Sequence, residues 1–205
     1  MKKLAVCLLS CLMMLGSVCA LADQGVALFT PYYDATINTP GVYATLPSAG
    51  GVLYTGPGTE YYRVDPFELT NARVHCLALA YDQFGTRWVL VEAKNYGLPW
   101  RGYVRLSAFS AANQEFLTAN LPYESSYDAL TPAMIAQLYN SCDGCLGPGE
   151  EYPMLFPLDV YATEGTLIMT SGNWALMELN EDTLEGIGVY GAKCRLWVKL
   201  DNLFY

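Results

Sequence analysis

An internal repeat constrains this chain more than any other feature of its sequence. The segment Gly-Pro-Gly-Thr-Glu-Tyr at 56–61 returns as Gly-Pro-Gly-Glu-Glu-Tyr at 147–152, an offset of 91 (147 − 56). Self-similarity at a fixed offset indicates that the chain folds as two copies of one structural unit. The length of 205 residues leaves room for two such copies, each of about 70–80 residues.

The repeat continues downstream of this turn in both copies. Each copy has an apolar run, a polar turn, a segment that opens with Trp and a closing apolar segment; these are 74–81, 82–85, 88–92 and 101–106 in the first copy, and 166–169, 171–173, 174–178 and 195–200 in the second. Short runs rich in Val, Leu, Tyr, Trp and Thr, bounded by Gly, Pro, Asn and Asp, predict strands joined by hairpin turns. We therefore expect an all-β protein with little helix. Closure of each copy into a small barrel would leave no unpaired edge strand.

Residues 1–22 predict an export segment. Two lysines precede an apolar stretch from Leu4 to about Val18, and Ala-Leu-Ala occupies positions 20–22. A basic start, a short apolar run and an A-x-A site are typical of a cleavable signal peptide. Two alternatives stay open, an uncleaved membrane anchor and a lipoprotein processed before Cys11. We expect the protein to be secreted or associated with the cell envelope.

Cleavage at this site would change both the charge and the cysteine count. The full chain has 11 basic and 20 acidic residues; without the two lysines of the segment, 9 basic residues face 20 acidic ones, a net charge of −11. This acidity argues against nucleic acid as a partner, because phosphate recognition needs clustered cations. The cysteines that remain are Cys76, Cys142, Cys145 and Cys194. An even number suits disulfides outside the cell, and pairings of Cys145 with either Cys142 or Cys194 are both open.

The first copy resembles the bacterial SH3-like (SH3b) domain. The resemblance rests on Gly-Pro-Gly-Thr-Glu-Tyr-Tyr at 56–62, on Trp88 at the head of a strand, and on Arg-Gly-Tyr-Val at 101–104. The second copy departs from the pattern, since Leu196 stands where the first copy has a glycine. The resemblance implies two tandem small SH3-like barrels after the signal peptide. We assign residues 36–112 to the first domain, 113–129 to a linker and 130–205 to a divergent second domain.

Aromatic residues form the candidate binding site. Flat rings at the rim of a small barrel can cover an extended peptide at low entropic cost. The resemblance implies peptidoglycan, through its stem peptides and cross-bridges, as the ligand class. A core position is the alternative for such aromatics, most clearly for Trp88 and Trp174. The candidates are Tyr61, Tyr62, Trp88, Trp100 and Tyr103 in the first copy and Tyr152, Trp174 and Trp197 in the second.

Other chemistry has weaker support in the sequence. Cys142-Asp-Gly-Cys145 could be a redox pair, part of a zinc site or a structural disulfide, and the last needs no further ligands. His75 is the single histidine, and on a strand it would point away from Cys76, so the two cannot form a catalytic pair. The carboxylates of 178–185 show no calcium-loop pattern. We therefore expect no catalytic residue, no metal and no cofactor.

Two functions follow as hypotheses. The first is an exported, non-catalytic protein of the cell envelope that binds peptidoglycan or a wall-associated peptide through its aromatic residues. The second is an interaction module that binds another exported protein and does not touch the wall. A cell-wall hydrolase that uses His75 is a minor third possibility, because a small barrel rarely supplies the cleft that such an enzyme needs.

Overall fold

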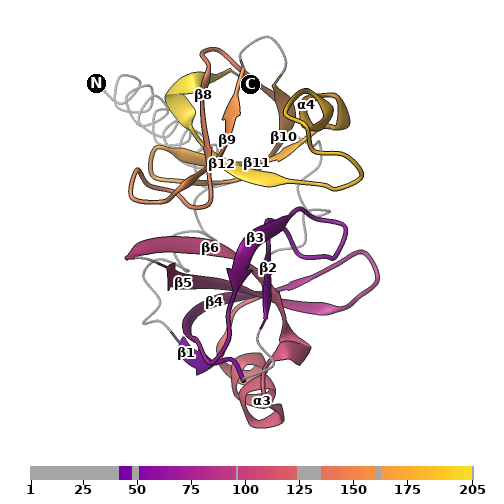
Figure 1. The fold of residues 1–205 in the computed structure, drawn as a ribbon, viewed down its shortest axis with the longest axis vertical. Coiled ribbons are helices and arrows are strands. Elements are labelled where there is room, and N and C mark those ends of the chain that lie inside the picture. The colour runs from indigo at the N-terminus through magenta and orange to yellow at the C-terminus, as the bar shows by residue number, and fades with distance from the viewer. Residues whose placement is uncertain (1–41, 48–50, 96, 124–134, 160–162, 205) are drawn as a thin grey trace, which may run out of the picture.

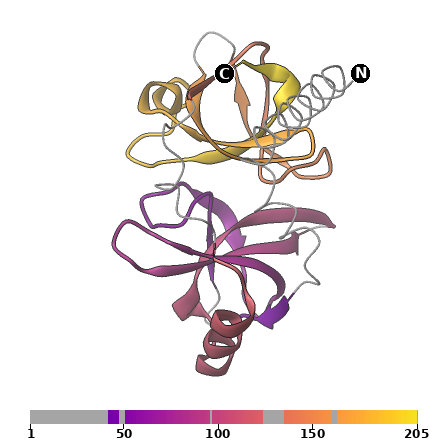
Figure 2. The same cartoon turned by 180° about the vertical axis from the view of Figure 1, so that it is seen from behind.

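The structure, a computed structural model, describes residues 42–47, 51–95, 97–123, 135–159 and 163–204. The expected signal peptide lies outside these ranges. Two β-rich units lie one above the other along the long axis of the molecule, and both views show the same stacking (Figures 1 and 2). We call residues 42–123 the first unit and residues 135–204 the second unit.

The first unit is a six-stranded antiparallel sheet with the order β1-β4-β5-β6-β2-β3. The second unit is a seven-stranded sheet with the order β13-β7-β10-β11-β12-β8-β9. The strands of the first unit are β1 (Val42–Thr45), β2 (Val52–Tyr54), β3 (Arg63–Glu68), β4 (Arg73–Tyr81), β5 (Arg87–Asn95) and β6 (Leu98–Arg105). Those of the second are β7 (Ile135–Leu138), β8 (Cys142–Cys145), β9 (Met154–Leu158), β10 (Glu164–Ser171), β11 (Trp174–Leu179), β12 (Arg195–Lys199) and β13 (Leu203–Phe204).

The two sheets have the same strand order once β13 is set aside. Their irregularities also correspond, because the register shifts between Cys76 and Ala78 in β4 and between Leu167 and Met169 in β10. Equivalent residues face equivalent partners: Tyr54 lies opposite Tyr103, and Cys145 lies opposite Trp197. The prediction of an all-β protein is confirmed. Each sheet is a linear series of hydrogen-bonded strands, and the closing strand pair expected of a barrel is not among the described pairings.

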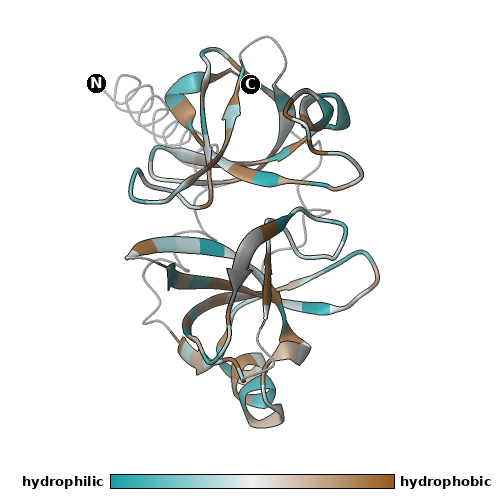
Figure 3. Cartoon of the chain, in the orientation of Figure 1, coloured by the Kyte–Doolittle hydropathy of each residue, from teal (hydrophilic) through white to brown (hydrophobic). Residues whose placement is uncertain are grey.

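The central strands of each sheet bury side chains on both faces. In β5, Val89 and Val91 enter the main core of the first unit, while Trp88 and Leu90 belong to a second cluster on the opposite face. Strand β11 divides its residues between two clusters in the same way. A strand buried on both faces reads as a continuous apolar run, as Trp-Val-Leu-Val does at 88–91. Apolar segments accordingly run along the strands, with polar residues at many of the turns (Figure 3).

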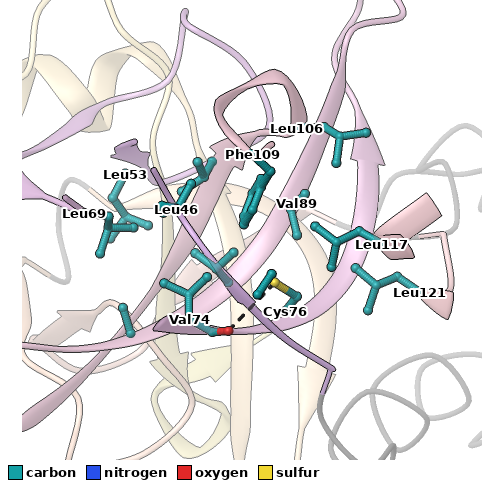
Figure 4. Close-up of a cluster of buried hydrophobic side chains, with 14 of the residues drawn as sticks. Leu46, Leu53, Leu69, Val74, Cys76, Val89, Leu106, Phe109, Leu117 and Leu121 are labelled. Carbon is teal, nitrogen blue, oxygen red and sulfur yellow. Dashed lines mark hydrogen bonds between the residues drawn. The ribbon is translucent and has the colours of Figure 1, made fainter. Parts of the chain in front are cut away.

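The start of the expected linker is instead a helix that completes the first unit. Helix α3 (Ala111–Asn120) begins after Ser110, whose side chain accepts a hydrogen bond from the Asn113 N–H at 3.3 Å, as an N-cap does. Leu117 and Leu121 pack into the main core beside Cys76 and Val89 (Figure 4). The second short helix, α4 (Glu181–Gly186), connects β11 to β12 and begins after Asn180. None of the described helices is long and apolar enough to cross a membrane.

Candidate functional site: the junction between the units and the groove beside Trp174

The two Gly-Pro-Gly turns hold tyrosine rings rather than a ligand. A side chain on Gly56 would place its Cβ 2.1 Å from the ring of Tyr61, and one on Gly147 would place its Cβ 2.0 Å from the ring of Tyr152. Real Cβ atoms do not approach that closely, so only glycine lets the ring lie flat on the turn. The glycine is therefore required at both turns by the tyrosine ring that packs on it.

Each of these tyrosines reaches the other unit. The Tyr61 hydroxyl donates to Oε2 of Glu178 at 2.7 Å and accepts from Nη2 of Arg195 at 3.1 Å. Arg195 and Glu178 are themselves paired at 2.8 Å, and the Arg195 guanidinium lies 5.0 Å from the centre of the Tyr61 ring. We call these three residues the Tyr61 bridge.

The Tyr152 bridge is the counterpart in the opposite direction. The Tyr152 hydroxyl donates a short hydrogen bond to Oε2 of Glu92 and accepts from Nη2 of Arg101 at 3.1 Å. Arg101 pairs with Glu92 at 2.7 Å and lies 5.4 Å from the centre of the Tyr152 ring. Because each unit gives a tyrosine and receives one, the contact is isologous, as in a twofold dimer. The repeat therefore forms an internal dimer within one chain.

The carboxylates of the two bridges stay ionised because their partners outweigh their burial. Burial by itself raises the pKa of Glu178, but the charge of Arg195 and the hydrogen bonds from Tyr61 and Arg195 hold that pKa below its usual range. Burial also raises the pKa of Glu92, but the hydrogen bonds from Tyr152 and Arg101 hold that pKa below its usual range. The pKa of Tyr61 is raised, chiefly by burial. The Tyr61 bridge is thus a neutral phenol held between a carboxylate and a guanidinium.

Backbone hydrogen bonds across the junction occur around only one of the two turns, among the described residues. The Tyr62 N–H donates to the Lys193 carbonyl at 2.6 Å, and the Lys193 N–H donates to the Glu60 carbonyl at 2.7 Å. In the repeat, Pro153 corresponds to Tyr62 and Pro99 corresponds to Lys193. Proline has no N–H, so neither bond can have a counterpart on the other side.

Most of the predicted binding aromatics are buried. Tyr61 and Tyr152 lie in the bridges. Three others are at most 4% exposed and belong to the smaller apolar cluster that each unit forms on the face opposite its main core; these are Trp88, Tyr103 and Trp197. The half-buried residues are Tyr62, which packs edge-on against Phe156, Trp100, which packs on the main core of the first unit, and Trp174. The expected row of rim aromatics in the first unit is therefore not present as an open surface.

Trp88 of the first unit is sealed from solvent. Its Nε1 donates to Oδ2 of Asp82 at 3.1 Å, and Asp82 also binds two N–H groups of the turn at 82–86. The Tyr54 ring meets Trp88 edge to face, with ring centres 5.4 Å apart, and Arg105 lies over the indole at 5.4 Å. With 1% of its surface exposed, Trp88 cannot contact a ligand.

Trp174, at the corresponding place in the second unit, borders an open groove of about 640 Å³. Two differences between the copies remove its cover. Cys145 replaces Tyr54, and the turn before the tryptophan shortens from the five residues 82–86 to the two residues 172–173, without a counterpart of Asp82. Lys199 takes the place of Arg105 and lies 5.7 Å from the Trp174 ring.

The Trp174 groove is lined by apolar and polar residues. The apolar side chains, which we call its walls, are Tyr152, Met154 and Trp174, beside the thiols of Cys142 and Cys145; the polar ones, which we call its rim, are Ser141, Asp143, Glu150, Lys199 and Asn202. At the rim Lys199 pairs with Glu150, with its Nζ 2.5 Å from Oε1. Such a mixture suits a ligand with both apolar and hydrogen-bonding groups.

The sequence interpretation missed the roles of the bridge residues and of the groove rim. It named Tyr152 and Trp174 as binding candidates, and both lie on the groove. The paired charges Glu92–Arg101 and Glu178–Arg195 were visible only as landmarks of the repeat. Their recurrence at equivalent places in otherwise apolar strands was the signal that could have identified them.

The four described cysteines are free thiols. Cys76 lies in the core of the first unit and Cys194 in that of the second, while Cys142 and Cys145 face the groove. Burial raises the pKa of the Cys76 and Cys194 thiols to about 12 and that of Cys142 to about 11. No disulfide joins them in this structure, so neither expected pairing is seen. A thiol with so high a pKa is a poor nucleophile at neutral pH.

His75 is not placed for catalysis with a cysteine. It stacks on Tyr43, with ring centres 4.9 Å apart, and lies opposite Glu92 across the strand pair, while Cys76 points into the core. Burial lowers the pKa of His75. Within the described ranges, no group of three or more His, Cys, Asp or Glu residues is placed to hold a metal ion.

Comparisons with known proteins give no match on which a function could be based. No protein-family model, curated protein or solved structure matches the chain. The fold and the groove are therefore the basis for the function.

Proposed function

We propose that this is an exported, non-catalytic binding protein of the cell envelope, built from two SH3-like units, that binds peptidoglycan or a wall-associated peptide. The binding site is the Trp174 groove of the second unit. The observation that carries the proposal is the difference between the copies: Tyr54 and the Asp82 turn cover Trp88, whereas Cys145 and a two-residue turn leave Trp174 beside an open groove. Two copies of one unit thus differ at the position where a ligand would bind.

The chemistry of the groove supports an extended peptide as the ligand. Tyr152, Met154 and Trp174 offer apolar contact to side chains or to the flat face of a peptide chain. Asp143 and Asn202 at the rim can hydrogen-bond backbone groups, which an extended peptide presents along its length. The export segment expected at 1–22 and the excess of acidic residues favour a partner outside the cell that is not nucleic acid.

Retention on purified sacculi tests this function. The mature chain, residues 23–205, is expected to co-sediment with sacculi, and Cys145→Tyr is expected to abolish retention because it supplies the ring that fills this place in the first unit. Trp174→Ala should also abolish it. Tyr81→Ala is the matched control, since Tyr81 is an exposed aromatic of the first unit that is not among the residues lining the groove.

The outcomes separate the candidate functions. Failure of the wild-type chain to bind sacculi would refute wall binding, and capture of another exported protein by wild type but not by Cys145→Tyr would favour the interaction module. Retention of Cys145→Tyr at the wild-type level, with a native circular dichroism spectrum, would show that the groove is not the binding site.

A further inference from the structure

Tyr152 has two roles that connect the first unit to the Trp174 groove. One part of the side chain lines the groove, together with Trp174 and Met154. Its hydroxyl ends in the first unit, on Glu92 and Arg101. The wall of a site in one unit is thus held by residues of the other.

The first unit fixes the Tyr152 ring from two directions. The hydroxyl is held by the short bond to Glu92 and by the Arg101 guanidinium at 3.1 Å, and that guanidinium also lies 5.4 Å from the ring centre. On the remaining side the ring rests against Gly147. Only 8% of the Tyr152 surface is exposed. A ring held at its tip, along one face and against its own turn has little freedom to swing into the groove.

Glu92 and Arg101 are well placed to act as a rigid support. They lie directly opposite each other on β5 and β6, which are neighbours in the middle of the six-stranded sheet. Their side chains are paired at 2.7 Å, and the Arg101 side chain is 10% exposed. A support built on paired central strands positions a side chain more precisely than a loop could.

We infer that Glu92 and Arg101 of the first unit are positioning residues for the Trp174 groove, so that the binding site belongs to both units although the groove opens in only one. The first unit, whose own tryptophan is sealed, thus holds Tyr152 in its position on the wall of the groove. The positioning rests on geometry alone, and only its consequence for binding rests on the proposed function.

The reactivity of Cys145 gives a measurement that does not need the ligand. Cys145 is 6% exposed and forms one cluster with Tyr152, so release of the tyrosine uncovers the thiol. In the full chain, Glu92→Gln and Tyr152→Phe are expected to raise the rate of Cys145 alkylation by iodoacetamide at least about tenfold. Tenfold corresponds to about 1.4 kcal/mol, close to the smallest contribution of a hydrogen bond to a charged group. The rate is read by mass spectrometry of the Cys145 peptide.

The other bridge supplies the matched control. Glu178→Gln removes the same charge from the Tyr61 bridge and should weaken the junction to a similar extent, yet it should leave the Cys145 rate within about twofold of wild type, well under the tenfold expected for one such bond. The alkylation rate of Cys76, in the core of the first unit, reports any general loosening of the fold in each variant.

The results overturn or support the inference separately from the proposed function. Equal Cys145 rates in Glu92→Gln and Glu178→Gln would overturn it, because the effect would then be general stability, and unchanged rates in Glu92→Gln and Tyr152→Phe would overturn it as well. Selective acceleration supports positioning whether or not sacculi are bound. If sacculi are bound, Glu92→Gln should weaken retention more than Glu178→Gln does.

Discussion

Replacement of Tyr61 by Phe tests whether the bridges hold the two units together. The change removes one hydroxyl, which donates to Glu178 at 2.7 Å and accepts from Arg195 at 3.1 Å, and leaves the ring on its glycine. Hydrogen bonds to charged groups contribute about 1.5–3 kcal/mol each. Since Glu178 and Arg195 keep each other at 2.8 Å, neither charge is left unpaired. We therefore expect a combined loss of about 2 kcal/mol, less than the sum of two such bonds, because the two charges still satisfy each other.

Urea unfolding measures this loss. With a slope of about 2.5 kcal/mol per molar urea, a loss of about 2 kcal/mol lowers the midpoint by about 0.8 M. The reciprocal variant Tyr152→Phe should lose a similar amount, because its hydroxyl has the same kinds of partners. Tyr190→Phe, a change in an exposed tyrosine outside both bridges, is the control and should leave the midpoint unchanged within error.

Two results would refute the reasoning. A midpoint shift below about 0.2 M for both Tyr61→Phe and Tyr152→Phe would mean that water replaces the lost bonds without cost, and that the bridges do not stabilise the junction. A large shift for Tyr61→Phe with none for Tyr152→Phe would mean that the two bridges do not contribute equally, although their partners are of the same kinds.

Two further predictions concern the turns and the bridge carboxylates. Gly56→Ala should lower the free energy of unfolding by about 3 kcal/mol, because the new Cβ would lie 2.1 Å from the Tyr61 ring. The control Gly85→Ala places its Cβ in open space and should lower it by only about 1 kcal/mol, because of the positive φ of that residue. Thermal unfolding of the two variants compares these losses, and equal losses would contradict the role of the ring contact. Stability should also fall with acidification: the pKa values of Glu92 and Glu178 are lowered in the fold, so their contribution is present above the unfolded value near 4.5 and is lost as the pH falls through the folded values. Unfolding midpoints from pH 7 to pH 3 test this, and a wild-type profile identical to that of a Glu92→Gln, Glu178→Gln double variant would contradict it.

Several features of the fold could be read from local sequence. Turn residues between short apolar runs predicted strands and hairpins, and the 91-residue offset predicted two copies; the structure has two sheets with a common strand order. Helix α3 was missed and its residues were assigned to a linker, because Ala-Ala-Asn-Gln shows no sustained helical periodicity. Its formation depends on Leu117 and Leu121 packing into the core, a long-range contact.

The candidate site was harder to predict, since exposure is not a property of a residue type. Trp88 and Trp174 are equivalent in the repeat, yet one is sealed and the other borders a groove. The residue that decides this, Tyr54 or Cys145, lies on another strand and meets the tryptophan only in the folded sheet. The copy with the better sequence match to the SH3-like pattern is the one whose tryptophan is covered.

The sequence by itself determined the repeated units, their β structure and the two glycine turns that carry Tyr61 and Tyr152, because hairpins and turns follow from residues close together in the chain. Only the tertiary structure decided where those tyrosines point. Each ring crosses to a carboxylate and a guanidinium of the other unit, and this pairing depends on how two sheets pack face to face. Leu90 and Tyr103 of the first unit and Leu176 and Trp197 of the second line one small pocket at the junction, so the burial of this face depends on the packing of the units and not on either copy alone.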